Sequence, residues 1–344
     1  MSLHSIAAGS FARLLADEVR KGAEVIAPAI VNGRPCWRRT TAEALESGPL
    51  DLGPARASEP IKALFFPPRG EVSRFFGEDS RPDLPDRILV GARQCDLAAL
   101  RILDFVFLEG PFKDPFYAAR RGKTLVISAD CNEPYETCFC TAVEGQPYAT
   151  KGYDLNLSDD GSTLLFETGS VQGDRFVEEH RVAFGRADET ARRVRDEARK
   201  VIANQIEARA KERQLEPAGG LRHVTRGREE HEVWDARAKD CVECGACNFA
   251  CPTCHCFYLL DVESGGGVRR FADWDACLYP KFARVAGGAN PRPRRAQRLL
   301  NRLEKKFSFF CDTTDALACT GCGRCVEACA GKIDIRDMLK ELVR

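Results

Sequence analysis

The chain has 344 residues, enough for about two domains, and its 44% of hydrophobic residues can form a full core. Its 51 basic and 51 acidic residues cancel, so no overall field draws the chain toward nucleic acid or an anionic membrane. No run of about 18 apolar residues occurs, and the first residues lack the long apolar block of a secretory signal. We therefore expect no membrane span, no signal peptide and no nucleic-acid partner.

The most informative part of the composition is the 17 cysteines. A secreted disulfide scaffold is usually shorter and has an even number of cysteines. A cytoplasmic chain keeps its thiols reduced, and clustered cysteines there are typical of metal or iron–sulfur ligands. The composition therefore predicts a cytoplasmic, metal-binding protein.

Strand and helix signals alternate along the first half of the chain. Short apolar runs bounded by Pro, Gly or charge predict buried strands at 62–68, 87–92 and 123–130. Apolar residues at helical spacing predict a helix at 95–108, and an Asp-Pro pair predicts the start of another at 114–121.

Segments 153–157 and 164–167 flank a turn signal and predict a β-hairpin. We therefore predict that residues 1–180 form one domain of the α+β or α/β class. Acidic and basic residues are interleaved along 187–214, which is typical of a long solvated helix, so residues 187–232 are expected to be a charged helical linker.

The character of the chain changes after the linker, because cysteines become dense and apolar runs become short. Helical patterns occur at 273–285 and 294–307. Residues 233–344 are therefore predicted to form a mainly α-helical ferredoxin-like domain that binds two [4Fe–4S] clusters.

Two cysteine runs give the strongest chemical signal. Each has the spacing C-x2-C-x2-C-x3-C, the ferredoxin pattern in which the fourth cysteine ligates the other cluster. One run alone could hold zinc, but two complete runs favour a pair of [4Fe–4S] clusters. We assign the first cluster to Cys241, Cys244, Cys247 and Cys329, and the second to Cys319, Cys322, Cys325 and Cys251.

Four further cysteines lie near these runs, at Cys254, Cys256, Cys277 and Cys311. The simpler interpretation is that they pack as small buried side chains around the clusters. The alternative is that they ligate a further site. His255, among them, is expected to lie near a cluster without binding it.

The N-terminal part holds four cysteines of its own, Cys95, Cys131, Cys138 and Cys140. Cys95 and Cys131 each follow a predicted strand, and the other two lie in the next loop. Strands that end on the same edge of a sheet would bring them together at the usual ligand edge. Four thiols could complete a third iron–sulfur or zinc centre, but their spacing does not demand one. Cys36 stands alone and is expected to be structural.

A basic segment precedes the second cysteine run. Arg294, Arg298 and Arg302 share one helix face, and the same segment also holds Lys305 and Lys306. A solvated face is the simplest interpretation. Cations that raise the potential of anionic clusters are a second, and a docking surface for an acidic partner is a third.

These motifs occur in an order that resembles the 4Fe-4S dicluster electron-transfer subunits, the family typified by the beta subunit of sulfhydrogenase together with its counterpart in anaerobic sulfite reductase. The C-terminal cysteine motif is common to many ferredoxin-like domains, so the N-terminal blocks are the more discriminating part. The matching blocks are Gly91–Asp96, Leu103–Asp104, Asp114–Tyr117 with Arg120 and Arg121, Cys131 with Cys138–Cys140, Cys241–Phe257, Trp274 with Cys277, Gly287–Asn290, Lys306–Phe307 and Cys319–Cys325.

The resemblance implies a cytoplasmic subunit that relays electrons between two partners: a flavin- and NAD(P)-binding subunit, and a terminal catalytic subunit of the hydrogenase or sulfur/sulfite reductase type. Such a relay needs no catalytic acid, base or nucleophile, and we predict none. The alternative is a redox enzyme with its own metal active site at the N-terminal cysteines. An iron–sulfur regulator is a weaker alternative, because no DNA-binding motif is present.

Overall fold

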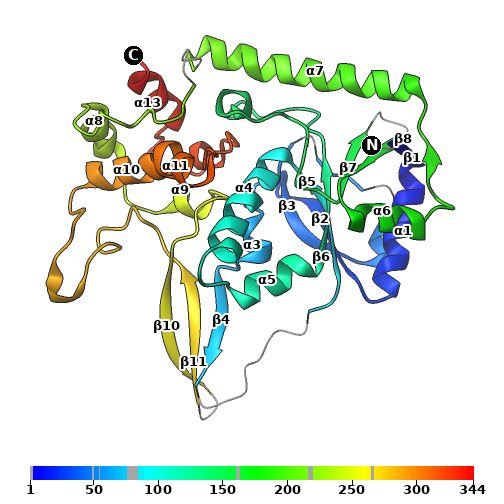
Figure 1. Cartoon of the computed structure of the whole chain (residues 1–344), viewed down its shortest axis with the longest axis horizontal. Coiled ribbons are helices and arrows are strands. Elements are labelled where there is room, and N and C mark those ends of the chain that lie inside the picture. The colour runs from blue at the N-terminus through cyan, green and yellow to red at the C-terminus, as the bar shows by residue number, and fades with distance from the viewer. Residues whose placement is uncertain are drawn as a thin grey trace.

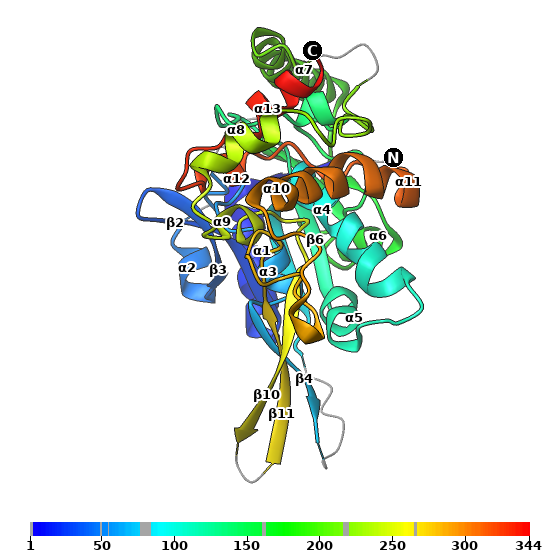
Figure 2. The ribbon, with the colours of Figure 1, turned by 90° about the vertical axis from the view of Figure 1, so that its left-hand side faces the viewer.

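The computed structural model describes residues 3–48, 50–53, 55–75, 84–159, 163–215, 220–264 and 267–344. An eight-stranded sheet with helices occupies the N-terminal part, and a group of short helices occupies the C-terminal part (Figure 1). A three-stranded sheet projects away from the rest of the molecule (Figure 2). The long helix α7 (Glu189–Glu212) lies across both parts.

The large sheet has the strand order β3-β2-β5-β6-β7-β8-β1-β9. Its adjacent strands β2, β5, β6 and β7 run parallel, and the other neighbours pair antiparallel. Every residue of β5 and β6 is buried, as expected for parallel strands covered on both faces. The strands are β1 (Leu3–Ala7), β2 (Glu24–Val31), β3 (Arg34–Thr40), β5 (Arg87–Ala92), β6 (Thr124–Ala129), β7 (Leu155–Asp159), β8 (Thr163–Thr168) and β9 (Gly185–Arg186).

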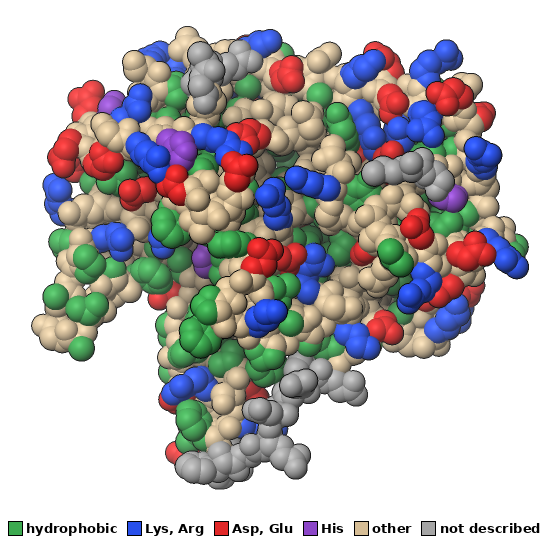
Figure 3. Space-filling model, in the orientation of Figure 1, with side chains coloured by type: hydrophobic (Ala, Val, Ile, Leu, Met, Phe, Trp, Pro, Cys, Tyr) green, Lys and Arg blue, Asp and Glu red, His purple; other side chains and the backbone are tan. Residues whose placement is uncertain are grey.

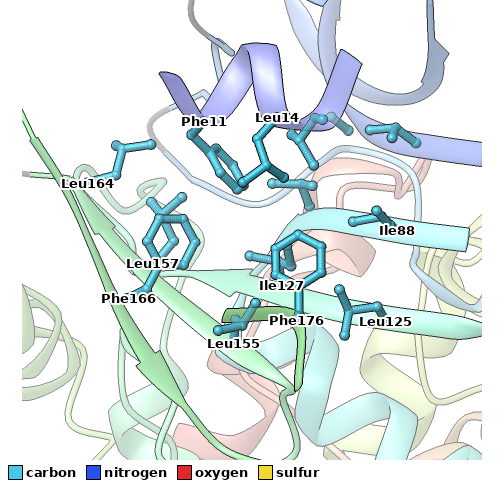
Figure 4. Close-up of a cluster of buried hydrophobic side chains, with 14 of the residues drawn as sticks. Phe11, Leu14, Ile88, Leu125, Ile127, Leu155, Leu157, Leu164, Phe166 and Phe176 are labelled. Atoms are coloured by element: carbon cyan, nitrogen blue, oxygen red, sulfur yellow. The ribbon is translucent and has the colours of Figure 1, made fainter. Parts of the chain in front are cut away.

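Two cores lie on the two faces of this sheet. One includes Phe11 and Phe166 and packs beneath α1 and α6 (Figure 4). The other includes Leu100, Tyr117 and Val126 and packs beneath α3, α4 and α5. The helices are α1 (Ala8–Arg20), α2 (Ala42–Glu46), α3 (Lys62–Phe65), α4 (Gln94–Asp104), α5 (Pro115–Gly122) and α6 (Val171–Glu179).

Most of the predicted N-terminal elements are confirmed. β5 and β6 match two of the three predicted strands, and β7 and β8 form the predicted antiparallel pair. Residues 160–162 of the turn between β7 and β8 lie outside the described residues. The Asp114 side chain caps α5 by accepting hydrogen bonds from the backbone N–H groups of Phe116 and Tyr117. α4 continues as a π-helical turn over Phe105–Glu109.

The predicted strand at 62–68 is wrong, because its first residues form helix α3. A short apolar run does not distinguish a strand from a buried helical turn. Tertiary contacts decide here: Lys62 is buried, its Nζ lies 4.1 Å from the centre of the Trp274 ring, and it donates hydrogen bonds to the backbone oxygens of Asn248 and Cys254. β4 (Arg69–Arg74) follows and belongs to the three-stranded sheet, not to the large sheet.

Helix α7 is confirmed, but one of its faces is not solvated. Arg199 is largely buried and forms ion pairs with Asp130 at 2.7 Å and Glu167 at 2.8 Å. Further along, Ile206 is buried, and Ala210 belongs to the C-terminal core. The helix therefore packs against the sheet through charge pairs and against the C-terminal part through apolar contacts.

The C-terminal part combines short helices with a second sheet. β11 (Gly267–Trp274) pairs with β10 (Phe257–Ser264) and with β4 from the N-terminal part. The predicted helix at 273–285 is wrong: Trp274 ends β11, and turns and a bend follow. The predicted helix at 294–307 is confirmed as α10 with a π-helical turn over Lys305–Phe309. The helices are α8 (Val233–Asp240), α9 (Ala246–Phe249), α10 (Arg295–Glu304), α11 (Phe310–Thr314), α12 (Arg324–Glu327) and α13 (Ile335–Leu342).

Across the described ranges, no helix has the length and apolarity needed to cross a membrane. Acidic and basic side chains are interspersed over the face of the molecule drawn in Figure 3. This pattern agrees with the equal numbers of the two charge types in the sequence.

Candidate iron–sulfur sites

The first candidate site is a cavity lined by three cysteines of the first run and two of the second. Cys241 follows α8, Cys244 precedes α9, Cys247 lies in α9, and Cys329 follows α12. Apolar side chains of α10 and α13 line the rest of the cavity. These four are the cysteines that the spacing groups together for the first cluster. Cys325 also reaches this cavity.

The second candidate site is a neighbouring cavity lined by Cys251, Cys319, Cys322 and Cys325. It thus takes three cysteines from the second run and the fourth from the first run. Since Cys325 lines both cavities, the two sites share a wall.

Glycines let the second cysteine run lie against the N-terminal part. Gly321 and Gly323 both have positive φ, at +63° and +72°. A Cβ at Gly321 would overlap the backbone of Cys140, and one at Gly323 would overlap Thr137. Only glycine therefore permits this backbone conformation and this close approach at once.

Two cations of the basic segment are buried beside the thiols. Lys306 Nζ lies 3.2 Å from Cys251 Sγ and 2.8 Å from Thr253 Oγ1, and Arg302 Nη2 donates a hydrogen bond to the backbone oxygen of Cys247 at 3.2 Å. Burial opposes the charged form of Lys306, but the thiols of Cys251 and Cys254 raise its pKa above the usual value. The prediction of a solvated face is therefore wrong for these two residues, and charge compensation is the interpretation that their burial favours. The same prediction is also wrong for Arg298, which is buried and pairs with Glu243.

The four N-terminal cysteines come together at the edge where β5 and β6 end. Cys95 lies in the first turn of α4, and Cys131 follows β6. Cys131 is within electrostatic reach of Cys95, Cys138 and Cys140. Burial raises the pKa of Cys131 to about 12 and also raises the pKa of the other three thiols. Thiols in such surroundings stay protonated unless a metal displaces the protons.

A buried ion pair joins this edge to the second cavity. Arg324, which lies within the second cysteine run between Cys322 and Cys325, pairs with Asp96 of α4 at 2.8 Å, and the two side chains are 1% and 0% exposed. Arg324 Nε also donates to the backbone oxygen of Ala57. On the same side, Arg56 donates to the backbone oxygen of Cys322 and forms an ion pair with Glu327.

Arg56, Asp96 and Arg324 are not among the site residues that the sequence predicts. Asp96 belongs to one of the blocks that carry the family resemblance, and this is the only signal that pointed to it. The partners lie more than 200 positions apart, so spacing could not have joined them.

The residues near the cysteine runs have different surroundings. Cys311 donates a hydrogen bond to the backbone oxygen of Phe307 and belongs to the C-terminal apolar core, as the packing interpretation predicts. His255 Nδ1 lies 3.0 Å from the backbone oxygen of Thr253, and burial lowers its pKa to about 4. It is therefore neutral at physiological pH, and its hydrogen-bond partner is backbone and not a thiol. Cys36 lies on β3 at the far edge of the sheet.

The donor chemistry of both cavities fits iron–sulfur clusters. Each cavity offers the four cysteine thiols that a cluster needs, with Cys325 lining both, and buried cations offset the negative charge that four thiolates bring. Within the parts of the chain that the structure describes, no three His, Cys, Asp or Glu side chains form a group that could hold a single metal ion.

The comparisons with known proteins agree with this geometry. The family model of the 4Fe-4S dicluster domain matches residues 240–333, the segment that contains both cysteine runs. The chain is therefore an iron–sulfur protein of the dicluster class, with two [4Fe–4S] clusters in this domain.

A relative is similar along most of the chain. Sulfhydrogenase 2 subunit beta from Pyrococcus furiosus is 32% identical over 296 residues, which cover 85% of this chain and 85% of the relative. The chain belongs to the family of 4Fe-4S dicluster electron-transfer subunits that includes the sulfhydrogenase beta subunit.

Proposed function

We propose that the chain passes single electrons through two [4Fe–4S] clusters with the ligand sets that the spacing predicts: Cys241, Cys244, Cys247 and Cys329 for the first, and Cys319, Cys322, Cys325 and Cys251 for the second. One observation carries the proposal. Each cavity combines three cysteines of one run with the fourth cysteine of the other run, which is the arrangement of a two-cluster ferredoxin. The shared wall at Cys325 supports transfer between the sites, because it keeps them adjacent.

We propose further that this relay works inside a cytoplasmic complex with two kinds of partner: a flavin- and NAD(P)-binding subunit, and a terminal catalytic subunit of the hydrogenase or sulfur/sulfite reductase type. The name of the relative, a beta subunit of a sulfhydrogenase, supports a place in such a complex. The chain's own residues would supply ligands, charge and docking surfaces, while the clusters supply the electron chemistry.

The third centre remains part of the proposal, with Cys95, Cys131, Cys138 and Cys140 as its ligands. Their convergence at one sheet edge supports it, as does the position of Cys322 within electrostatic reach of Cys95 and Cys138. A cluster at this edge would extend the electron path into the N-terminal part.

Iron and acid-labile sulfide per chain, measured on anaerobically purified protein, test the proposal together with electron paramagnetic resonance of the reduced form. About twelve irons are expected with all three centres, and about eight with the two ferredoxin-type clusters alone. About eight would remove the third centre from the proposal. Fewer than about eight, without a coupled-spin signal, would contradict the two-cluster relay itself.

A second candidate function is a redox enzyme with its own metal active site at the N-terminal cysteines. A cavity of about 760 Å³ favours it, because Cys95 and Cys140 line this cavity together with Cys319 and several charged side chains. An optical change on adding sulfite or polysulfide to the isolated chain would support this function. No change, and no turnover without partner subunits, would contradict it.

We expect Lys306→Met to lower the reduction potential of the second cluster by on the order of 100 mV. At an effective dielectric of about 20, a unit charge close to the cluster contributes about 4 kcal/mol. For one electron, about 1.4 kcal/mol corresponds to about 59 mV. The expected shift of about 100 mV is smaller than the full conversion, because the charge of a cluster is delocalised. Lys305→Met is the matched control, because Lys305 is exposed and screened by solvent. Equal shifts in both variants, measured by redox titration, would show that Lys306 does not tune the cluster.

A further inference from the structure

Two cysteines outside both candidate cavities meet at the base of the β10–β11 hairpin. Cys256 directly precedes β10, and Cys277 follows β11 by three residues. The backbone N–H of Asp275 donates to the backbone oxygen of Cys256 at 2.9 Å, which continues the strand pairing beyond Phe257 and Trp274. The hairpin therefore holds the two residues close, and the two thiols lie within electrostatic reach of each other.

A buried amide fixes one of these thiols. Asn248, which is 1% exposed, donates from Nδ2 to Cys277 Sγ at 3.1 Å. The backbone oxygen of the same residue accepts a hydrogen bond from Lys62 Nζ at 3.0 Å. Cys277 thus accepts a hydrogen bond from Asn248 and has a second thiol nearby, which is the environment of a reactive sulfur and not of a packed apolar side chain.

The charges around the pair also favour the thiolate form of Cys277. The neighbouring Cys256, together with Asn248, Arg302 and Lys305, lowers the pKa of Cys277 against the effect of burial. The reactive form of the pair has one thiolate and one thiol. Cys277 is buried and Cys256 is half-buried, so Cys256 is the thiol that a reactant can reach.

We propose that Cys256 and Cys277 form a redox-active dithiol that closes reversibly to a disulfide, with a disulfide-bonded sulfur compound as its oxidant. The Cys256 proton passes to Cys277, and the Cys256 thiolate attacks one sulfur of the compound. A mixed disulfide forms and one thiolate leaves. Cys277 gives its proton to that thiolate and attacks Cys256 Sγ, which releases the second thiolate.

The exchange is balanced. One disulfide bond is broken in the compound and one forms in the protein, so two electrons pass from the two cysteines to the compound. The chain would thereby hold a two-electron site beside its sites for one-electron carriers. Asn248 also connects them, because it lies next to Cys247 of the first cavity in the sequence.

The test uses the full chain, purified anaerobically with its clusters and equilibrated in buffers of glutathione disulfide and glutathione. We expect two thiols per chain to become resistant to alkylation with a single midpoint, and a Cys256–Cys277 linked peptide to appear in mass spectra. The iron content is expected to stay constant. Cys311→Ser, which removes a buried thiol of the same part of the chain, should leave the linked peptide in place.

Two variants separate the roles of the pair. Cys277→Ser should accumulate a glutathione adduct at Cys256, since the resolving thiol is gone, and Cys256→Ser should accumulate none at Cys277. Absence of the linked peptide from the wild-type chain at every buffer ratio would overturn the proposal. A Cys251–Cys254 peptide in its place would also overturn it, as would the loss of about four irons in Cys256→Ala, which would make Cys256 a cluster ligand.

Discussion

Replacement of Cys322 by Ser is expected to remove about four irons per chain and the spin coupling between the two clusters. Cys322 lines the second cavity, and a Cβ at its neighbour Gly323 would overlap Thr137, so the loop that carries Cys322 is packed tightly against the N-terminal part. The same variant is expected to unfold at lower denaturant concentration, because metal binding and folding are coupled where the metal forms part of the core.

Cys311→Ser is the matched control for this prediction. Cys311 is also buried in the C-terminal part, but its thiol donates to a backbone oxygen and lines neither candidate cavity. Its replacement should preserve the full iron content. If Cys322→Ser kept the iron content of Cys311→Ser, the ligand set of the second cluster would be wrong.

Arg324→Met is expected to destabilise the protein by about 3–5 kcal/mol, the cost of leaving one partner of a buried ion pair without the other. The partner is Asp96, which is fully buried and also accepts a hydrogen bond from the backbone N–H of Arg93. Removal of the guanidinium would leave this carboxylate in a low-dielectric interior with one neutral donor. The midpoint of urea unfolding, followed anaerobically by tryptophan fluorescence, measures the effect.

Arg270→Met tests whether burial is the cause. Arg270 pairs with Asp261 in a bidentate geometry on the surface of the hairpin, where both side chains are more than a third exposed. Its loss should cost less than about 1 kcal/mol. Similar costs for the two arginine variants would contradict the explanation, and an Asp96→Asn/Arg324→Met double variant should lose less than the two single variants together.

The spacing of cysteines carried most of what the sequence could reveal about the site. A repeated four-cysteine pattern restricts ligand geometry locally, and so each cavity contains the residues that the pattern groups. The prediction of α7 was similarly secure, because its charged pattern is long enough to have one interpretation, whereas β5 and β6 were predicted from runs as short as the one that is wrong at 62–68. The surroundings of the candidate clusters were harder to predict from the sequence. Lys306 belongs to a basic segment that is evident in the sequence, but no local pattern indicates that its side chain is buried.

The failures share a physical cause. The segments 62–68 and 273–285 were both predicted wrongly, and each adopts its structure through contacts with the other region. Lys62 packs on Trp274, and β4 pairs with β11. Local propensity cannot report a partner about 200 positions away. The Arg324–Asp96 pair was invisible for the same reason.

The pairing of β4 with β11 also affects how the chain is synthesised. Arg74 and Arg269 are paired in the sheet, so β4 leaves the ribosome long before the strand that covers its backbone groups exists. The parallel core strands β5 and β6 and their helices can assemble in the meantime, because all of them precede the long helix. The β10–β11 hairpin follows them, and the second cysteine run comes later still. Because each candidate site takes cysteines from this second run, neither cluster can be completed before the run is synthesised, and the backbone edge of β4 stays open to association with other strands until β11 exists.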